Sequence, residues 1–437
     1  MEAWKTAESI IKILNENGHA AYFVGGCVRD RLMGLEPDDI DITTAAIPTE
    51  IKELFGKTVD TGAKHGTVTV LKDGFSFEIT TFRTEDGYAD HRKPDGVHFV
   101  RDIREDLRRR DFTINAVAYH PQEGIVDPYG GKNDIQNKII RCVGNPDERF
   151  EEDALRMLRC VRFACKTGFE VESETLAAIC RKKALISYVS AERIYAELKK
   201  SVTGAYPMAL ALAQETGLFS IFLPELSACF KTPQHTKYHI YDVGNHILHT
   251  VAAAKNNETV RLAALLHDIG KPLCRTTDEK GTDHFYGHEA KSAVLADGVL
   301  KRLKADNAMK NRVTAIIKEH RLEQEPTDFY VKQKILAVGK DNFSYLLDLM
   351  DADTAAHNQK ETKERQRQMR VFREKYNEII NRGDPLCIAD LALKGGDIMR
   401  AGFKDAEIGK VQKKLLNFVL EHPEANTREI LLERITK

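Results

Sequence analysis

Two glycines and two aspartates near the start of the chain have the types and spacing for metal-dependent phosphate chemistry. Gly25 and Gly26 end an apolar run, and such small residues let backbone N–H groups approach a ligand closely. Asp39 and Asp41 are two residues apart, so in a strand their carboxylates converge on one face. Paired carboxylates without thiols or histidines beside them are hard ligands that suit Mg²⁺. Such a pair alone is more often a solvated loop, but the glycine turn before it favours nucleotidyl transfer.

The elements that position these residues follow from the hydrophobic pattern. The short apolar and aromatic run Ala20–Val24 predicts a buried strand. After the glycine turn, Arg29 lies on an expected helix over Val28–Met33, and Asp39 and Asp41 are expected within one strand. Mixed strands and helices over roughly the first 130 residues indicate a small α/β head. The other elements expected in this head are helices over Glu2–Asn17 and Thr44–Phe55 and a hairpin of Thr67–Leu71 and Phe75–Thr81.

The stretch Tyr22–Asp41, which reads YFVGGCVRDRLMGLEPDDID, resembles the signature of class II nucleotidyltransferases of the polymerase β superfamily. These are the tRNA CCA-adding enzymes and the bacterial poly(A) polymerases. The resemblance implies an α+β fold in which a polymerase-β-like nucleotidyltransferase head is followed by mostly helical neck, HD and tail regions. It also implies that Gly25, Gly26 and Arg29 bind the nucleotide.

The resemblance assigns the catalytic role to Asp39 and Asp41. Together they would hold two Mg²⁺ ions, one that lowers the pKa of the attacking hydroxyl and one that clamps the triphosphate. The superfamily implies a third carboxylate, and Glu78 is our candidate for it.

A basic stretch at Leu107–Ala118 resembles the second motif of the same family, which contacts the sugar and the phosphates. On this resemblance Arg110, Asp111 and Asn115 belong to the nucleotide site. Arginine suits that role because its planar fork binds phosphate oxygens through two parallel hydrogen bonds. A charge run of this kind is more often a solvated face.

Four further charged residues, Asp153, Arg156, Arg159 and Arg162, are spaced by three and are expected near one another along a helix face. A salt-bridged amphipathic helix would give the same pattern. The string EDALR resembles the family's EDxxR nucleotide-selecting motif, in which Asp153 would accept from the exocyclic amino group of cytosine or adenine and Arg156 would donate to the ring nitrogen. Uracil and guanine place a carbonyl there, at a cost of roughly 1–3 kcal/mol. No nucleic-acid template is needed.

The polar stretch Phe82–Val100 lacks periodicity and predicts a surface loop. It resembles the flexible loop of CCA-adding and A-adding enzymes, and the residues at the pattern positions are Arg83, Glu85, Tyr88, Asp90 and Arg92. Enzymes that add only CC lack this loop, so its presence argues against that activity.

The second half of the chain carries a histidine and aspartate constellation. His267 and Asp268 follow an apolar helical stretch, with His246 upstream and Asp353 downstream. The pattern resembles the H…HD…D ligands of HD-superfamily phosphohydrolases, and mixed histidine and carboxylate ligands suit a transition metal such as Ni, Mn or Co. A lone histidine is more often a core residue, and a degenerate HD fold that only supports RNA is the alternative. Three more histidines lie between Asp268 and Asp353, namely His284, His288 and His320.

Composition limits the remaining possibilities. The net charge is −1, so any surface for nucleic acid must be a local basic patch. Eight cysteines without a CxxC pair fit reduced thiols. We expect a cytoplasmic protein with no membrane contact, because the N-terminus lacks a signal-peptide pattern and no apolar run reaches membrane-spanning length.

The resemblance spreads over most of the chain and gives a domain division and a reaction. We expect a nucleotidyltransferase head at 1–135, a helical neck and body at 136–230, an HD-type domain at 231–360 and a tRNA-contacting tail at 361–437. The implied reaction adds CCA to the 3′ end of tRNA from CTP and ATP and releases pyrophosphate. An A-adding enzyme and a poly(A) polymerase share the motifs and stay open. A non-enzymatic RNA-binding module or an HD phosphohydrolase with a relic head would not need both Asp39 and Asp41.

Overall fold

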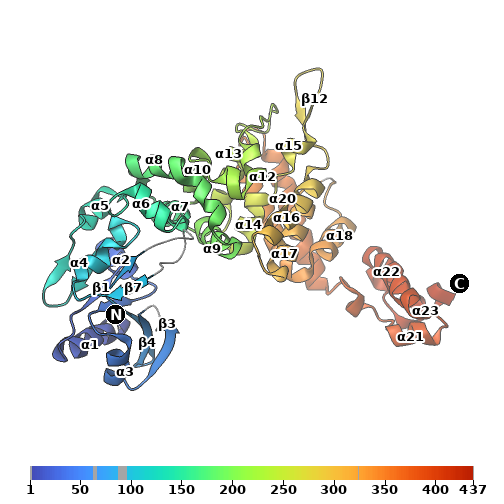
Figure 1. Ribbon diagram of the computed structural model, residues 1–437. Helices are drawn as coiled ribbons and strands as arrows, with labels where there is room; N and C mark the ends of the chain where they lie inside the picture. The colour runs from blue at the N-terminus through green and yellow to red at the C-terminus, as the bar shows by residue number, and fades with distance from the viewer. Residues whose placement is uncertain (1, 63–65, 87–95, 323, 437) are drawn as a thin grey trace. The chain divides into compact units, whose positions relative to one another are not determined.

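In the computed structural model of the protein, the described residues are 2–62, 66–86, 96–322 and 324–436 (Figure 1). The chain divides into two compact units, 1–222 and 223–437. The first unit contains a large sheet and several helices, and the described part of the second unit is helical apart from one short two-stranded ribbon. The predicted α+β class, with a sheet-containing head followed by helices, is confirmed. The division into four domains stays a prediction.

The sheet of the first unit has seven strands in the order β3-β4-β5-β2-β1-β8-β9. Strand β2 therefore lies at the centre, parallel to β5 and antiparallel to β1. Because β2 begins at Asp41, the sheet fixes this carboxylate at the start of its central strand. The strands are β1 Ala21–Val24, β2 Asp41–Thr44, β3 Thr58–Gly62, β4 Thr67–Lys72, β5 Phe75–Thr81, β8 Ala118–His120 and β9 Gly124–Val126.

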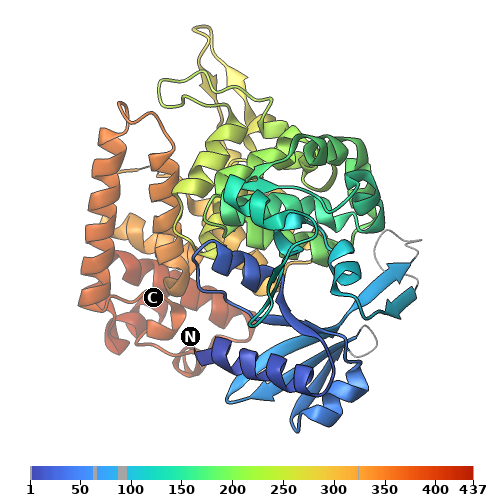
Figure 2. The ribbon, with the colours of Figure 1, turned by 90° about the vertical axis from the view of Figure 1, so that its left-hand side faces the viewer.

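Helix α1 (Glu2–Glu16) packs beside β1 and β2 and carries part of the head's hydrophobic core (Figure 2). Its apolar residues recur at the helical spacing, so one face is buried and the other is solvated. At its start, the ring of Trp4 stacks on that of Phe23 in β1, with centroids 3.9 Å apart. The helix expected from the sequence is confirmed.

Two neighbouring helices differ from the expected boundaries. Helix α2 (Gly26–Leu32) begins directly at the glycine turn rather than at Val28. Helix α3 (Pro48–Leu54) begins at the proline, because Thr44 is still paired with β1 as the last residue of β2. The expected hairpin of β4 and β5 is confirmed, and Asp73 and Gly74 at its turn both have positive φ.

The stretch predicted to be an irregular loop has paired ends. Strand β6 (Arg83–Asp86) pairs antiparallel with β7 (Gly96–Phe99). Both ends contain residues that pair well in strands, such as Thr84 opposite His98. The positions Tyr88, Asp90 and Arg92 lie outside the described residues.

The rest of the first unit is mainly helical. Helix α7 packs against α9, and α6 packs against α8. The main elements here are α4 Ile103–Arg108, the 3-10 turn Thr113–Asn115, α5 Gly131–Asn137, β10 Ile139–Ile140, α6 Pro146–Glu152, α7 Leu155–Thr167, β11 Glu170–Val171, α8 Ser173–Lys182, α9 Ala191–Val202, α10 Ala211–Glu215 and α11 Phe219–Phe222.

The second unit is built around α14, whose side chains are all buried except that of Glu258 at its start. Helix α14 packs against α13, α17 and α19. None of the described helices is both long and apolar enough to cross a membrane. The elements are α12 Pro224–Cys229, α13 Val243–Ala253, α14 Glu258–Leu266, α15 Lys271–Cys274, β12 Thr276–Thr277, β13 Asp283–His284, α16 His288–Arg302, α17 Asn307–Glu319, α18 Asp328–Val338, α19 Phe343–Ala355, α20 Lys363–Arg382, α21 Gly395–Arg400, α22 Ala406–Glu421 and α23 Arg428–Thr436.

Candidate functional site

A pocket of about 590 Å³ opens in the first unit where β2 and α2 begin. All the residues that the sequence predicts for catalysis and nucleotide binding line this one pocket, although they come from positions more than 100 residues apart in the chain. They are Gly25, Gly26, Arg29, Asp39, Asp41, Arg110, Asp111, Asn115, Asp153, Arg156, Arg159 and Arg162. We call this cavity the head pocket.

Gly25 forms the narrowest part of the head pocket. Its φ is 75° and its ψ is −132°, a backbone conformation that strongly favours glycine. A Cβ at this position would lie 3.0 Å from Arg110 Nη1 and 3.8 Å from Asp41 Oδ2. The glycine therefore lets the backbone, a guanidinium and a carboxylate meet at one point.

The two aspartates do not lie in one strand as expected. Asp41 is the first residue of β2, and Asp39 precedes the strand because pairing with β5 starts only at Asp41. In that pairing Asp41 is in register with Glu78. Burial raises the pKa of Asp41, Arg110 counteracts this, and the neighbouring charges of Glu78 and Asp39 raise the pKa further. Three carboxylates that destabilise one another's charge are a setting that a bound cation relieves.

A chain of hydrogen bonds holds the second motif in place. The buried Arg29 donates from Nη1 to Asn115 Oδ1 at 2.6 Å and also pairs with Asp30 at 2.6 Å. Asn115 donates to Asp111 Oδ1 at 3.2 Å, and Arg159 donates from Nε to Asp111 Oδ2 at 2.7 Å. Burial acts to raise the pKa of Asp111, but Arg159 and Asn115 more than offset it and lower the pKa to about 2. Asp111 thus stays ionised.

The base-selecting residues are arranged differently from the prediction. Asp153 does not share a helix face with Arg156, because its extended backbone separates α6 from α7. Its Oδ1 accepts from the Leu155 N–H at 3.1 Å, and its Oδ2 accepts from Arg193 Nη2 at 2.7 Å. Arg156 donates to Glu152 and, at 2.9 Å, to the Arg109 carbonyl.

The remaining arginines of α7 surround an aromatic ring. The guanidinium of Arg162 lies 4.1 Å from the centroid of Phe163, and those of Arg29 and Arg159 lie at 5.3 Å and 5.5 Å. Arg162 Nε also pairs with Glu197 in α9 at 2.6 Å. A ring that packs against several guanidinium groups fixes their positions without neutralising their charge.

The two described ends of the predicted loop contribute to the same pocket. Arg83 lines the head pocket and pairs with Glu85 at 2.9 Å. Glu85 also accepts an ion pair from Arg109 at 3.1 Å. The base of the loop is thereby tied to the segment that carries the second motif.

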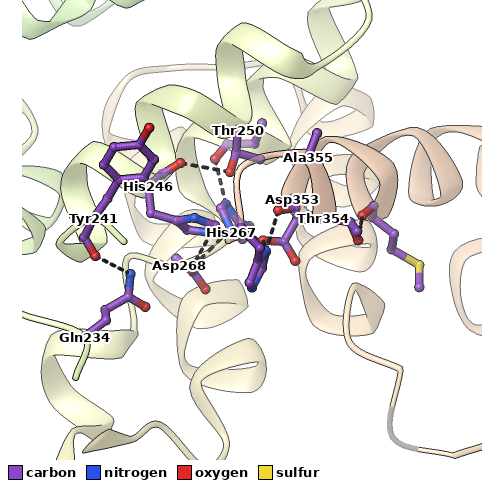
Figure 3. A network of polar contacts seen from close by, with 12 residues as sticks. Gln234, Tyr241, His246, Thr250, His267, Asp268, Asp353, Thr354 and Ala355 are labelled. Carbon is purple, nitrogen blue, oxygen red and sulfur yellow. Dashed lines mark hydrogen bonds and ion pairs between the residues drawn. The ribbon is translucent and has the colours of Figure 1, made fainter. Parts of the chain in front are cut away.

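A second, larger pocket of about 1450 Å³ lies in the second unit, and the predicted HD residues meet in or beside it. His246 lies on α13, His267 and Asp268 follow α14, and Asp353 lies on α19 (Figure 3). His246 Nε2 is 2.9 Å from Asp353 Oδ1, and His267 Nε2 is 3.2 Å from Asp268 Oδ2. The structure brings these four residues together, and we call them and the histidines around them the HD cluster.

Further histidines extend the HD cluster beyond the predicted set. In the described residues, three groups of possible ligands have their atoms within 4.8 Å of one another. They are His246, His267 and Asp268; His239, His246 and His357; and Asp268, His288 and His320. The sequence pattern did not predict His239 and His357, and nothing in their spacing distinguishes them from core histidines.

The protonation of these histidines suits metal binding. The Nδ1 atoms of His267, His288, His320 and His357 each lie 2.6–2.7 Å from a backbone carbonyl three or four residues earlier. An Nδ1–H that donates to a carbonyl leaves the Nε2 lone pair for a metal. Burial lowers the pKa of His320 to about 3 and, with Arg365 adding to the effect, that of His357 to about 4, so both rings are neutral. The donor set fits a borderline transition metal.

Three family models match successive parts of the chain. The poly A polymerase head domain matches residues 21–141, the probable RNA and SrmB-binding site of polymerase A matches 168–230, and the HD domain matches 236–390. The chain belongs to the family of tRNA nucleotidyltransferases and bacterial poly(A) polymerases, with an HD domain.

Curated relatives of this nucleotidyltransferase family member include two CCA-adding enzymes. That of Geobacillus sp. (strain WCH70) is 49% identical over 226 residues, which is 52% of this chain and 56% of the relative. That of Ligilactobacillus salivarius (strain UCC118) is 52% identical over 206 residues, which is 47% of this chain and 51% of the relative. The chain spans about half the length of the curated relatives it matches.

Solved structures match over a longer span. The Bacillus stearothermophilus CCA-adding enzyme in complex with CTP has a TM-score of 0.71 and 29% identity, over 99% of this chain and 97% of that one. The Thermotoga maritima CCA-adding enzyme complexed with tRNA has a TM-score of 0.55 at 19% identity, over 98% of this chain and 93% of that one, which shows the fold alone.

Sequence reasoning missed several residues of the head pocket. Arg193 in α9 holds Asp153, Phe163 orders the arginines, and Lys166 pairs with Asp30 at 3.1 Å. Lys166 and Phe163 lie on α7 one turn or less beyond Arg162, so helical spacing could have found them. Arg193 had no such signal, because only the packing of α9 against α7 brings it to Asp153.

Proposed function

We propose that the head pocket adds nucleotides to the 3′ end of tRNA, and that the product is the CCA end. The observation that carries the proposal is the meeting of Asp39 and Asp41 with the arginines of two separate motifs in one pocket. The 3′-hydroxyl of tRNA attacks the α-phosphorus of CTP or ATP, the bond to the β-phosphate breaks, and pyrophosphate leaves. The relatives' names favour CCA as the product.

Mg²⁺, held by Asp39 and Asp41, supplies acidification of the attacking hydroxyl and charge neutralisation of the triphosphate when it is bound. Glu78 stands beside Asp41 in the sheet and is the proposed third carboxylate. Arg110 faces Asp41 across Gly25, where it attracts a phosphate oxygen without displacing the carboxylates. Arg29 is buried against Asn115, so it positions the second motif and the glycine turn.

Base choice in this proposal depends on Asp153. Its carboxylate accepts from the exocyclic amino group of C or A, and a base with a carbonyl at that place leaves it unpaired. Arg193 holds Asp153 at 2.7 Å, and Arg156 is fixed by Glu152 and a backbone carbonyl. Two immobilised side chains select better than two flexible ones because they cannot turn to suit a wrong base.

The decisive experiment offers the purified chain three tRNAs: one that lacks the CCA end, one that ends in CC and one with the complete end. CTP and ATP are supplied separately and together. Addition of the whole CCA to the shortest tRNA supports the proposal. Incorporation of A onto the CC-ended tRNA alone makes the chain an A-adding enzyme, and long tails on any RNA make it a poly(A) polymerase.

We further propose that the HD cluster binds a transition metal such as Ni, Mn or Co and acts as a phosphohydrolase. The close approach of His246, His267, Asp268 and Asp353 supports this. Metal analysis of the purified chain tests it, since a domain that only supports RNA would take up no transition metal. The proposed reaction on tRNA is one of the cytoplasm, and the helical tail at 361–437 is the proposed further contact to tRNA.

A further inference from the structure

The two carboxylate oxygens of Asp268 face different partners. Oδ2 lies 3.2 Å from His267 Nε2 and 3.6 Å from His246 Nε2. Oδ1 lies 3.3 Å from the Nε2 of His288, which starts α16. Asp268 is only 1% exposed, and neither oxygen accepts a hydrogen bond of good geometry. A buried carboxylate that directs its oxygens to two separate sets of ring nitrogens has the geometry of a bridge between two cations.

The set on the Oδ1 side is preorganised. His288 Nδ1 lies 2.7 Å from the Phe285 carbonyl, and His320 Nδ1 lies 2.6 Å from the Ile317 carbonyl. Both rings are buried, and their centroids are 5.4 Å apart at an angle of 70°. Core histidines that serve only packing have no need to present their Nε2 atoms to the same carboxylate oxygen.

We propose that the HD cluster binds two divalent transition-metal ions bridged by Asp268. His246, His267 and Asp353 hold the first ion with Oδ2, and His288 and His320 hold the second with Oδ1. The inference rests on the proposed metal binding by this domain, and it adds a second position that the H…HD…D pattern does not contain.

The remaining group, His239, His246 and His357, competes with this assignment because it shares His246. His246 Nε2 lies 2.9 Å from Asp353 Oδ1, which directs it to the first ion. His357 Nδ1 is engaged with the Asp353 carbonyl at 2.6 Å, and no carboxylate completes the group of three histidines. The Asp268 side is therefore the better second position, since an anionic ligand offsets the charge of the ion.

The experiment measures metal stoichiometry in the full chain. All proteins carry Asp39→Asn and Asp41→Asn so that the head pocket does not contribute ions. After chelator treatment they are titrated with Mn²⁺, and bound manganese is counted by equilibrium dialysis with elemental analysis. The reference protein should bind two ions, and its electron paramagnetic resonance spectrum should show the closely spaced hyperfine lines of an interacting pair.

Single substitutions then locate the second ion. His288→Gln and His320→Gln should each bind one ion with the spectrum of isolated Mn²⁺, and the control His357→Gln should keep two. Circular dichroism checks that each variant is folded. One ion in the reference protein overturns the second position alone, and no ion overturns metal binding by the domain as well. Loss of the second ion in His357→Gln, with retention in His288→Gln, assigns it to the other group and overturns the bridge.

Discussion

The head pocket and the HD cluster both gather carboxylates, but they surround them with opposite partners. The head pocket sets Asp39 and Asp41 among arginines, and no histidine lines it in the described part of the chain. The HD cluster surrounds Asp268 and Asp353 with neutral imidazoles. Hard oxygen ligands suit Mg²⁺ that arrives with a nucleotide, whereas histidine ligands suit a metal that stays bound. One chain thus contains an exchangeable and a resident type of metal site.

The two regions also differ in how the fold assembles them. The catalytic aspartates and glycines of the head come from one short stretch around β1 and β2. The HD cluster draws its residues from several helices between α13 and α19. A site on a sheet edge keeps one side open to a polymer end, whereas a site inside a helical unit is enclosed on most sides. The difference fits tRNA as the substrate of the first and a small phosphate ester as that of the second.

The largest expected effect separates the two sites by removing the head's metal ligand. Asp41→Asn should reduce nucleotide addition by more than about 1000-fold, because it loses several kcal/mol of transition-state stabilisation. Incorporation of labelled CTP into tRNA that lacks CCA measures the loss. The exposed Asp60→Asn, which removes only a surface pair with Lys52, serves as the control. Normal turnover of Asp41→Asn would contradict the assignment of the dyad.

Metal exchange tests the difference in ligand type. After removal of all metals, Mg²⁺ alone should restore nucleotide addition, because the head pocket offers only oxygen ligands. The HD cluster should stay empty of transition metal until Mn²⁺, Co²⁺ or Ni²⁺ is added, and His267→Gln should not retain it. Activity assays and elemental analysis of the same samples report on the two sites. A requirement for the transition metal in nucleotide addition would mean that the sites are not independent.

Base choice gives a smaller effect that is confined to the head. Asp153→Ala should raise incorporation of UTP relative to CTP by roughly 5- to 150-fold, which corresponds to a penalty of about 1–3 kcal/mol. Arg193→Gln should act in the same direction but more weakly, because it only frees Asp153 to turn. Competition assays with mixed nucleotides measure both. If Asp153→Ala keeps full preference for C and A, the selection depends on other residues.

Local spacing accounts for what could be predicted from the sequence. Gly25, Asp39 and Asp41 are close in the chain, so turn and strand geometry were enough to bring them together. The pairing of Glu78 with Asp41 depends on the register of two strands, and only the resemblance suggested it. Arg193 could not be predicted, because tertiary packing decides its neighbour.

Two further failures have a physical cause. The spacing of Asp153 and Arg156 looked helical, but the aspartate caps one helix and breaks the chain before the next. His288 and His320 were seen in the sequence without a role, since nothing in their spacing shows that α16 and α17 bring them to Asp268.

The smallest predicted effect concerns the stability of the head and depends on pH. Asp111 has a folded-state pKa of about 2, below its usual value of 3.8, because Arg159 and Asn115 outweigh the effect of burial. The folded state therefore favours the ionised group, and this stabilisation of roughly 2 kcal/mol is complete above pH 3.8 and lost as the pH falls towards 2. Asp111→Asn should destabilise the head by about that amount at pH 7, and the difference should shrink below pH 4.

The head offers both a reporter and a matched control for this measurement. Trp4 is the only tryptophan of the chain and is buried against Phe23, so urea unfolding followed by its fluorescence reports on the first unit rather than on the HD cluster. Asp147→Asn removes an exposed pair with Arg181 in the same unit and should change stability little at any pH. If the two variants behave alike at pH 7, the hydrogen-bonded chain from Arg29 to Arg159 does not stabilise the head pocket. A difference that persists below pH 3 would instead mean that packing of the side chain, and not its charge, holds the second motif in place.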